Sequence, residues 1–190
     1  MSNDYYQTKA SVDEYIKHAE GINGADLIEK LKRFLPAGSK VLELGTGPGA
    51  DWEILSADYQ VTGSDFSKEF LKRLMLKEPN AEFLELDASS IITDKKFDCI
   101  YSNKVLHHLK DEELVKSINR QRKVLKPAGI VCHSFWKGQG SEVFNGLFVN
   151  NHQKEELISY FEVFFDMLLI ELYTEFDSND SILLIAQKKS

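Results

Sequence analysis

The stretch Val41-Leu-Glu-Leu-Gly-Thr-Gly-Pro-Gly-Ala-Asp51 decides the fold. It opens with a short apolar run and continues with glycines at positions 45, 47 and 49. Such a run is typical of a buried strand that stops abruptly at a turn. Glycine adopts positive φ angles and lets the backbone approach a ligand closely. The apolar positions between Trp52 and Leu55 predict a short helix, whose free N–H groups point back at the turn. This strand–loop–helix unit is suited to hold a nucleotide-like ligand.

The glycine loop alone leaves the ligand open. Gly45, Gly47 and Ala50 satisfy the G-x-G-x-x-G/A pattern of dinucleotide-binding sites, so a nicotinamide or flavin cofactor competes with other nucleotides. A tight turn without any ligand is the structural alternative.

Composition limits the class of protein. The chain has 190 residues, of which 43% are hydrophobic and 28% charged, and this composition favours one globular domain with a sizeable core. The formal net charge of −7 argues against a nucleic-acid partner, which usually leaves a basic footprint, and against a membrane surface. We find no signal-peptide pattern and no apolar stretch of transmembrane length, so we expect a soluble cytoplasmic protein.

The two cysteines, Cys99 and Cys132, lie in apolar runs that are typical of strands. We therefore expect buried free thiols rather than a disulfide scaffold. Neither cysteine has the spacing of a zinc site, and no metal is predicted.

Helix and strand patterns alternate along the chain. Ser11 with Glu14 predicts a capping box, and Asp111 predicts the cap of a later helix. Met75 and Val115 are assigned to the buried faces of their helices. Residues 136–151 contain glycines and are expected to be irregular. The predicted helices cover residues 12–19, 25–35, 52–55, 68–77, 112–125 and 153–161, and the predicted strands cover 40–44, 61–64, 81–86, 97–102, 130–135, 166–176 and 182–187.

This order predicts an α/β fold of the Rossmann-like kind: a three-layer sandwich around a seven-stranded, mostly parallel sheet. A tight polar turn over residues 177–180 makes the last strand antiparallel to the one before it. We expect a single domain, in which residues 1–37 form an N-terminal helical cap and residues 38–190 the cofactor-binding sheet. In such sheets a ligand binds at the carboxyl ends of the strands, where the strand order reverses.

Acidic residues follow the second and third predicted strands. Asp65 lies 20 positions after Gly45, where a carboxylate accepts hydrogen bonds from both ribose hydroxyls of an adenosine. A turn or helix-cap aspartate is the competing interpretation. Asp87 closes the third strand, where either a polar contact to an adenine amino group or a turn cap is expected.

Several motifs then occur in a fixed order along the chain. With the closing hairpin, this ordered set resembles the class I S-adenosylmethionine-dependent methyltransferases over residues 38–188. A nicotinamide enzyme needs neither the Leu-Lys-Pro-x-Gly turn nor an antiparallel last strand. The motifs are Glu43-Leu-Gly-Thr-Gly-Pro-Gly49, Asp65, Leu86-Asp87-Ala88, Phe97-Asp98, Leu106-His107-His108-Leu109 and Leu125-Lys-Pro-Ala-Gly129.

The resemblance implies S-adenosyl-L-methionine as the cofactor and a role for each matching position. Glu43 would orient the methionine amino group, Asp65 would bind the ribose hydroxyls, and Asn103 would lie beside the sulfonium. Tyr5, Tyr6 or Tyr15 could close over the cofactor from the cap, although core packing also explains Tyr15. The remaining implied cofactor-binding residues are Gly45, Thr46, Gly47 and Gly49 near the methionine and ribose, and Phe66, Asp87 and Ala88 near the adenine.

The implied reaction is in-line displacement of the methyl group onto an unidentified acceptor. A general base is needed only if the acceptor must lose a proton, and His108 is the candidate among His107, His108 and His133. The sequence Ser102-Asn103-Lys104 departs from the Asn-Pro-Pro-Tyr motif of enzymes that methylate planar amino groups. The chain has no large inserted substrate domain, which favours a small-molecule acceptor.

The acceptor would be bound by the cap and by residues 135–151, where Trp136, Phe144 and Phe148 could form an apolar wall. Two other functions remain open at this point. One is a non-catalytic S-adenosylmethionine-binding sensor or regulatory module, and the other is an NAD(P)-dependent oxidoreductase. Turnover of the methyl donor separates the first from an enzyme, and a nicotinamide titration tests the second. Oligomeric state is not readable from the sequence.

Overall fold

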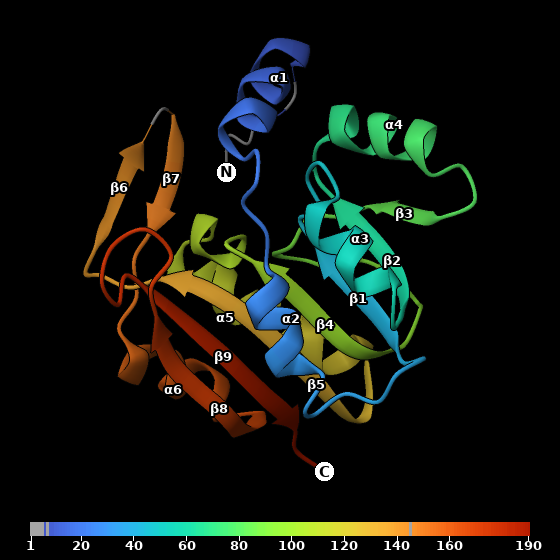
Figure 1. Cartoon of the computed structure of the whole chain (residues 1–190). Helices are drawn as coiled ribbons and strands as arrows, with labels where there is room; N and C mark the ends of the chain where they lie inside the picture. The colour runs from blue at the N-terminus through green and yellow to red at the C-terminus, as the bar shows by residue number, and fades with distance from the viewer. Residues whose placement is uncertain (1–5, 7, 145) are drawn as a thin grey trace.

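The core of the protein is a seven-stranded sheet with strand order β3-β2-β1-β4-β5-β9-β8. The computed structural model describes residue 6, residues 8–144 and residues 146–190 (Figure 1). Strands β1 to β5 pair in parallel, and β9 is antiparallel to both β5 and β8. The predicted mostly parallel sheet with an antiparallel last strand is confirmed. The strands are β1 (Lys40–Leu44), β2 (Gln60–Asp65), β3 (Glu82–Glu85), β4 (Phe97–Asn103), β5 (Leu125–Trp136), β8 (Phe165–Tyr173) and β9 (Ser181–Lys188).

Helices cover both faces of the sheet and make it the middle layer of three (Figure 1). Side chains alternate across a strand, so Val41 packs with α2 and α3 whereas Leu42 and Leu44 face the side of α5 and α6. Helix α4 packs against the edge of the sheet, and α1 lies beside α4 beyond the strand ends. The helices are α1 (Lys9–His18), α2 (Ala25–Leu31), α3 (Ala50–Ser56), α4 (Lys68–Lys77), α5 (Asp111–Val124) and α6 (Lys154–Phe161).

The two helices of the predicted cap have different positions. Helix α1 lies over the carboxyl ends of the strands, where a ligand is expected. Helix α2 instead packs on the sheet, with Leu27, Ile28 and Leu31 fully or almost fully buried in the core.

Two predicted helix starts are wrong, by three residues for α1 and by one residue for α5. Helix α1 begins at Lys9, because Thr8 Oγ1 accepts a hydrogen bond from the Ser11 backbone N–H at 3.2 Å and acts as the cap. Helix α5 begins with Asp111, and Lys110 is its cap residue. The Asp111 carboxylate instead accepts a hydrogen bond from Asn150 Nδ2 at 2.7 Å.

Two residues assigned to buried helix faces are exposed. Met75 is 47% exposed and Val115 is 48% exposed, whereas their neighbours Leu74 and Leu114 are buried. Consecutive helical residues differ by about 100° around the axis, so one of each pair leaves the core-facing stripe.

Residues 136–151 are not irregular. Within them, β6 (Ser141–Phe144) and β7 (Leu147–Asn150) pair as an antiparallel hairpin. The hairpin lies next to the short 3₁₀ helix η2 (Leu106–His108) that follows β4.

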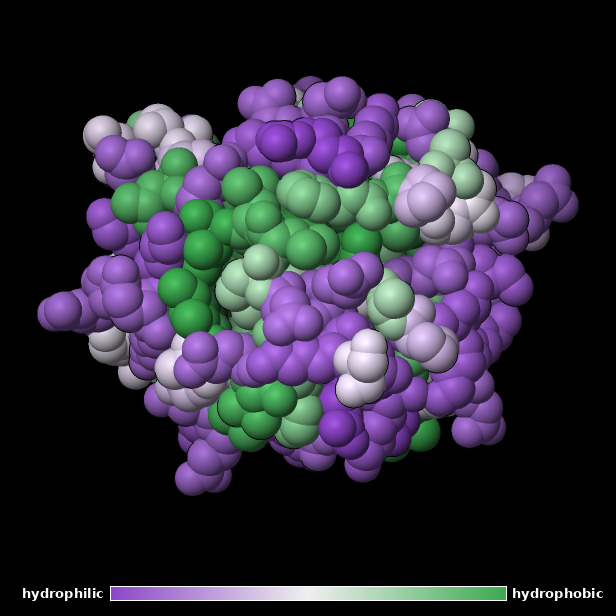
Figure 2. All heavy atoms as spheres, turned by 90° about the horizontal axis from the view of Figure 1, so that it is seen from below, coloured by the Kyte–Doolittle hydropathy of each residue, from purple (hydrophilic) through white to green (hydrophobic). Residues whose placement is uncertain are grey.

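The molecular surface is mixed in character. On the face seen in Figure 2, hydrophilic residues surround a band of hydrophobic ones. Across the described ranges, no helix combines the length and apolar character that crossing a membrane would require.

Candidate functional site

The glycine loop follows β1 and is fastened to β2. The Thr46 N–H donates to the Ser64 carbonyl at 2.8 Å, and the Ser64 N–H donates to Thr46 Oγ1 at 2.9 Å. Gly45 and Gly47 have φ angles of +68° and +52°, in the left-handed region that favours glycine. A Cβ at Gly45 would lie 2.5 Å from Val105 Cγ2, so the loop also packs too closely on the β4 side for any side chain.

Asp65 at the end of β2 holds the loop from the other side. One carboxylate oxygen accepts from the Gly47 N–H at 2.8 Å, and the other accepts from the Ser67 N–H at 2.7 Å. Burial raises the pKa of Asp65, and the backbone N–H donors that face it act in the opposite direction. Asp65 therefore combines the predicted position with a structural role in the turn.

A first cavity lies at the carboxyl ends of the strands, beside the point between β1 and β4 where the strand order reverses. It collects eight of the residues predicted from the sequence for the cofactor or for catalysis. These residues are Gly45, Gly47, Asp65, Phe66, Asp87, Ala88, Asn103 and His108.

An adjoining cavity shares the glycine loop and Asn103 with the first one. Glu43 and Thr46 line this second cavity, and Trp136 and Phe176 form part of its wall. Gly49 has a structural role instead. It precedes α3 with a φ of +92°, and a Cβ there would lie 2.7 Å from Leu74 Cδ2.

Aromatic rings cover the first cavity from the N-terminal side. Tyr15 of α1 meets Tyr6 edge-on with ring centroids 5.3 Å apart, and it meets Phe70 of α4 at 5.6 Å. All three residues line the cavity, so Tyr15 faces the site. Tyr5, the other tyrosine named for this role, lies outside the described residues.

Two acidic side chains lie at the floor of the second cavity. Glu43 is only 3% exposed, and its Oε2 has no hydrogen-bond partner among the described residues. Burial is the main cause that raises the pKa of Glu43 well above its usual range, and the nearby Asp51 adds to it.

Asp51 was not predicted as a functional residue, yet it is a hydrogen-bonding centre. Its carboxylate accepts from the Gly24 N–H at 2.6 Å, the Tyr101 hydroxyl at 2.7 Å and Asn103 Nδ2 at 3.1 Å. The signal in the sequence was an acidic residue in the first turn of the helix after the glycines. Its partners come from residues far away in the chain, so no local pattern announces them.

Asn103 is held on both sides at the end of β4. Its amide donates to Asp51, and its Oδ1 accepts from Ser134 Oγ at 2.5 Å.

The next residue, Lys104, adopts a left-handed φ of +52°. Its ammonium lies 2.7 Å from Glu175 Oε2 and 3.4 Å from the centroid of the Trp136 ring. Burial lowers the pKa of Lys104.

The three candidate histidines differ in their surroundings. His108 lines the first cavity, and its Nδ1–H donates to the Phe148 carbonyl at 2.8 Å, which leaves Nε2 as a proton acceptor in the neutral ring. Burial lowers the pKa of His108 and favours this neutral form. His107 is buried beside it. His133 is buried with both ring nitrogens paired, to Ser102 and Gln121 at 2.8 Å each, and burial lowers its pKa to about 3.

The predicted acceptor wall is built in part. Trp136 stacks on Phe176 with ring centroids 5.9 Å apart, while Phe148 contributes its carbonyl to His108. The side chain of Phe144 lies outside the described residues. Leu147 of β7, which belongs to the segment predicted to bind the acceptor, lines the first cavity.

The chain is similar to known methyltransferases in sequence and in fold. Residues 41–129 match the family model described as a methyltransferase domain. The chain is 34% identical over 109 residues to 2-methyl-6-phytyl-1,4-hydroquinone methyltransferase of Synechocystis sp.. The matched region covers 54% of this chain and 33% of that protein. The chain is also 34% identical over 107 residues to phosphoethanolamine N-methyltransferase of Triticum aestivum, covering 53% of this chain and 21% of that protein. The chain thus spans a third or less of the length of these relatives.

Solved structures share the fold over nearly the whole chain. An S-adenosylmethionine-dependent methyltransferase from Clostridium acetobutylicum superimposes with a TM-score of 0.77 at 14% identity, covering 94% of this chain and 97% of the other. A Burkholderia thailandensis 1,6-didemethyltoxoflavin-N1-methyltransferase, solved with S-adenosylhomocysteine, gives a TM-score of 0.79 at 16% identity, covering 95% and 85%.

Proposed function

We propose that this chain, which has the fold and central sequence of the class I S-adenosylmethionine-dependent methyltransferases, transfers a methyl group from S-adenosylmethionine to a small-molecule acceptor. The proposal rests on one observation: the glycine loop, Asp65 and Glu43 line two cavities that adjoin each other. Each of the three offers a group that a different part of the cofactor needs.

The residues present fit this cofactor. Glu43 has a buried carboxylate oxygen without a partner among the described residues, which is costly unless a ligand satisfies it. The ammonium group of the methionine moiety would supply both hydrogen bonds and the opposite charge. Asp65 would accept from the ribose hydroxyls through lone pairs that its backbone donors leave free. A Cβ at Gly47 would have its nearest heavy atoms 4.0 Å away, which leaves space for a ligand beside the backbone.

The adenine would lie at the ends of β2 and β3. Phe66 offers a ring face and Ala88 a small side chain on the cavity wall. The Asp87 carboxylate accepts from the Ser89 N–H at 2.7 Å, so it caps its turn and still has lone pairs for an amino group. Both interpretations of Asp87 from the sequence are therefore compatible.

The bound cofactor supplies an activated methyl group on a sulfonium. The protein's task is to align the acceptor with that methyl group and to exclude water, which in favourable cases contributes on the order of 7–11 kcal/mol. Asn103 is oriented by Asp51 and Ser134, which hydrogen-bond its amide from both sides. Tyr6, Tyr15 and Phe70 cover the first cavity from the N-terminal side. His108 would accept the acceptor's proton at Nε2.

The candidate acceptor site is where the second cavity adjoins the first beside Asn103, because Asn103 lines both cavities and His108 lines the first. The second cavity joins the apolar rings of Trp136 and Phe176 to the charged pair Lys104–Glu175. Such a small, mixed wall suits a small molecule better than a folded macromolecule. The names of the two relatives also refer to small acceptors, 2-methyl-6-phytyl-1,4-hydroquinone and phosphoethanolamine. The net charge of −7 disfavours a nucleic-acid acceptor.

The test is calorimetric titration with S-adenosylmethionine and S-adenosylhomocysteine. Asp65→Asn keeps an oxygen acceptor for only one of the two backbone donors, Gly47 N–H and Ser67 N–H, and loses the charge. We therefore expect affinity to fall by roughly 10- to 150-fold, the equivalent of about 1.5–3 kcal/mol for hydrogen bonds to a charged group. Glu85→Gln, on the neighbouring exposed strand end, is the matched control and should bind normally. If neither compound binds the wild type, or Asp65→Asn binds as tightly, the proposal is wrong.

Binding alone does not separate an enzyme from a sensor. Incubation with labelled S-adenosylmethionine and a pool of small metabolites should release S-adenosylhomocysteine above the rate of a no-acceptor control. Binding without turnover in any acceptor pool would favour the regulatory module instead.

A further inference from the structure

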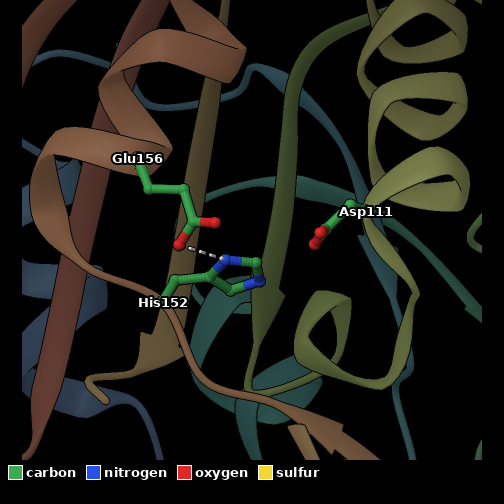
Figure 3. Close-up of side chains that lie close together, drawn as sticks. All are labelled: Asp111, His152 and Glu156. Carbon is green, nitrogen blue, oxygen red and sulfur yellow. Dashed lines mark hydrogen bonds and ion pairs between the residues drawn. The ribbon is translucent and has the colours of Figure 1, made fainter. Parts of the chain in front are cut away.

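Three side chains that no part of the proposed reaction uses meet on the α5–α6 side of the sheet. They are Asp111 at the start of α5, His152 between β7 and α6, and Glu156 in the first turn of α6 (Figure 3). Each offers one atom able to bind a metal, and these atoms lie within 4.8 Å of one another.

His152 is the unusual member of this group. Its side chain is 0% exposed, and its Nδ1 lies 3.1 Å from Glu156 Oε2. An ionised carboxylate only accepts hydrogen bonds, so Nδ1 carries the proton and Nε2 carries the free lone pair. Nε2 is buried and has no hydrogen-bond partner within the part of the chain that the structure describes. A buried polar atom of this kind requires an explanation.

The position of the ring is set by its neighbours. Phe135 and Tyr160 meet the imidazole edge-on, with ring centroids 5.7 Å and 6.2 Å away. Figure 3 shows Glu156 on one side of the imidazole and Asp111 on the other. Asn150 Nδ2 donates to Asp111 Oδ1 at 2.7 Å and so orients that carboxylate, which remains exposed to solvent.

We propose that Asp111 and His152 bind a divalent transition-metal ion such as Zn²⁺, with Glu156 holding the imidazole through Nδ1. Imidazole nitrogen and carboxylate oxygen are ligands that Zn²⁺ accepts at about 2.0–2.2 Å, so an ion between two ligands spans about 4 Å. The three candidate ligand atoms lie within 4.8 Å of one another, and Figure 3 shows the imidazole nitrogen that is not bonded to Glu156 on the side of Asp111, so a movement of the exposed carboxylate would bring Asp111 to an ion bound at that nitrogen. A metal-binding histidine that donates its other N–H to a carboxylate is the usual outer-shell arrangement. Water would complete the coordination on the exposed side.

The ion would fasten two segments that also border the first cavity. Asp111 follows His108 by three residues, and His152 follows Phe148 by four, and His108 and Phe148 are already joined by a 2.8 Å hydrogen bond. Metal binding would therefore strengthen an existing contact between η2 and the β6–β7 hairpin. The metal site does not depend on the proposed methyl transfer.

The test is titration of tag-free, metal-stripped protein with Zn²⁺, followed by calorimetry, with Mg²⁺ as the control ion. We expect one Zn²⁺ per chain and no comparable Mg²⁺ binding. Glu156→Gln should weaken Zn²⁺ binding by about 10- to 100-fold, as the loss of such outer partners does elsewhere. Asp111→Asn should weaken it at least as much. The matched controls are the exposed neighbours, Glu155→Gln and Glu112→Gln, which should bind as the wild type.

A second measurement identifies the ligand directly. In ¹⁵N-histidine NMR spectra, Zn²⁺ should shift the Nε2 resonance of His152, whereas the exposed His18 should not respond at the same concentration. Circular dichroism verifies that each variant is folded. The proposal is overturned if no Zn²⁺ binds, if all variants bind equally, or if only His18 responds, since the last two results indicate an adventitious ion.

Discussion

Gly45 carries two separate structural demands, and a pair of substitutions can measure each. Its φ of +68° is unfavourable for alanine, at a cost of about 1–2 kcal/mol. The Cβ would also lie 2.5 Å and 2.9 Å from the two methyl carbons of Val105, and overpacking of this kind costs about 1–3 kcal/mol. Gly45→Ala should therefore lower the free energy of unfolding by about 2–5 kcal/mol.

Gly21→Ala is the matched control. Gly21 has a φ of +80°, yet nothing lies within 4 Å of a Cβ there among the described residues, so only the conformational cost of about 1–2 kcal/mol applies. Both substitutions equally restrict the unfolded chain, and that effect cancels in the comparison. In a chain of this size each kcal/mol corresponds to about 2–4 °C in Tm. Thermal unfolding should place Gly45→Ala about 4–20 °C and Gly21→Ala about 2–8 °C below the wild type.

Val105→Ala removes the methyl carbons that the new Cβ would meet. In the double variant, the clash contribution of about 1–3 kcal/mol should be recovered, so the two substitutions should be non-additive by that amount. Denaturant unfolding of all four proteins measures this coupling. If the effects add within about 0.5 kcal/mol, or if Gly45→Ala and Gly21→Ala are equal, close packing on Val105 is not what requires glycine here.

Three further predictions concern protons. Burial raises the pKa of Glu43 well above its usual range, and an ammonium group would favour the charged carboxylate, so S-adenosylmethionine binding should release a proton at any pH at which the free protein holds Glu43 protonated. Calorimetry in buffers of different ionisation enthalpy should detect the release in the wild type but not in Glu43→Gln. The pKa of His108 is lowered from 6.5, so turnover should fall only when the pH drops below that value. The His108→Gln variant should turn over about 10²–10⁴-fold more slowly, and its rate should no longer fall at acidic pH. Full turnover of this variant at every pH would rule out His108 as the general base. Burial lowers the pKa of His133 from its ordinary value of 6.5 to about 3 in the folded protein. Between these two pH values the unfolded chain binds more protons than the folded one. The free energy of unfolding should therefore decrease as the pH falls, by up to about 1.4 kcal/mol per pH unit. Denaturation from pH 4 to 7 should show a smaller slope for His133→Gln, and an unchanged slope would contradict this assignment.

The sheet was predictable because its strands are short apolar runs that end at glycine, proline or aspartate. Val41 to Leu44 is such a run, and the carboxyl ends of parallel strands meet at one edge whatever their exact lengths. Asp65 and Asp87 could be placed at the cavity for the same reason, because Asp65 closes β2 and Asp87 follows β3 by two residues.

Contacts between distant segments were not predictable. The hydrogen bonds of Asp51 join it to residues 24, 101 and 103, which share no pattern with it in the sequence. The β6–β7 hairpin was missed because its strands have four residues each, too short for a clear alternation. The caps of α1 and α5 were missed because more than one polar residue near each start could have served.

The position of β9 has a consequence for synthesis of the chain. Although β9 comes latest of the described strands, it lies between β5 and β8 and supplies hydrogen bonds to both. Until residues 181–188 leave the ribosome, β5 and β8 each present an unpaired edge, and strand edges of this kind pair readily with other chains. Closing the sheet therefore has to wait until all of its other strands have been made. Nascent chains that stall before Ser181 should be substrates for chaperones or aggregate, even though the glycine loop and the residues of the first cavity have already been made.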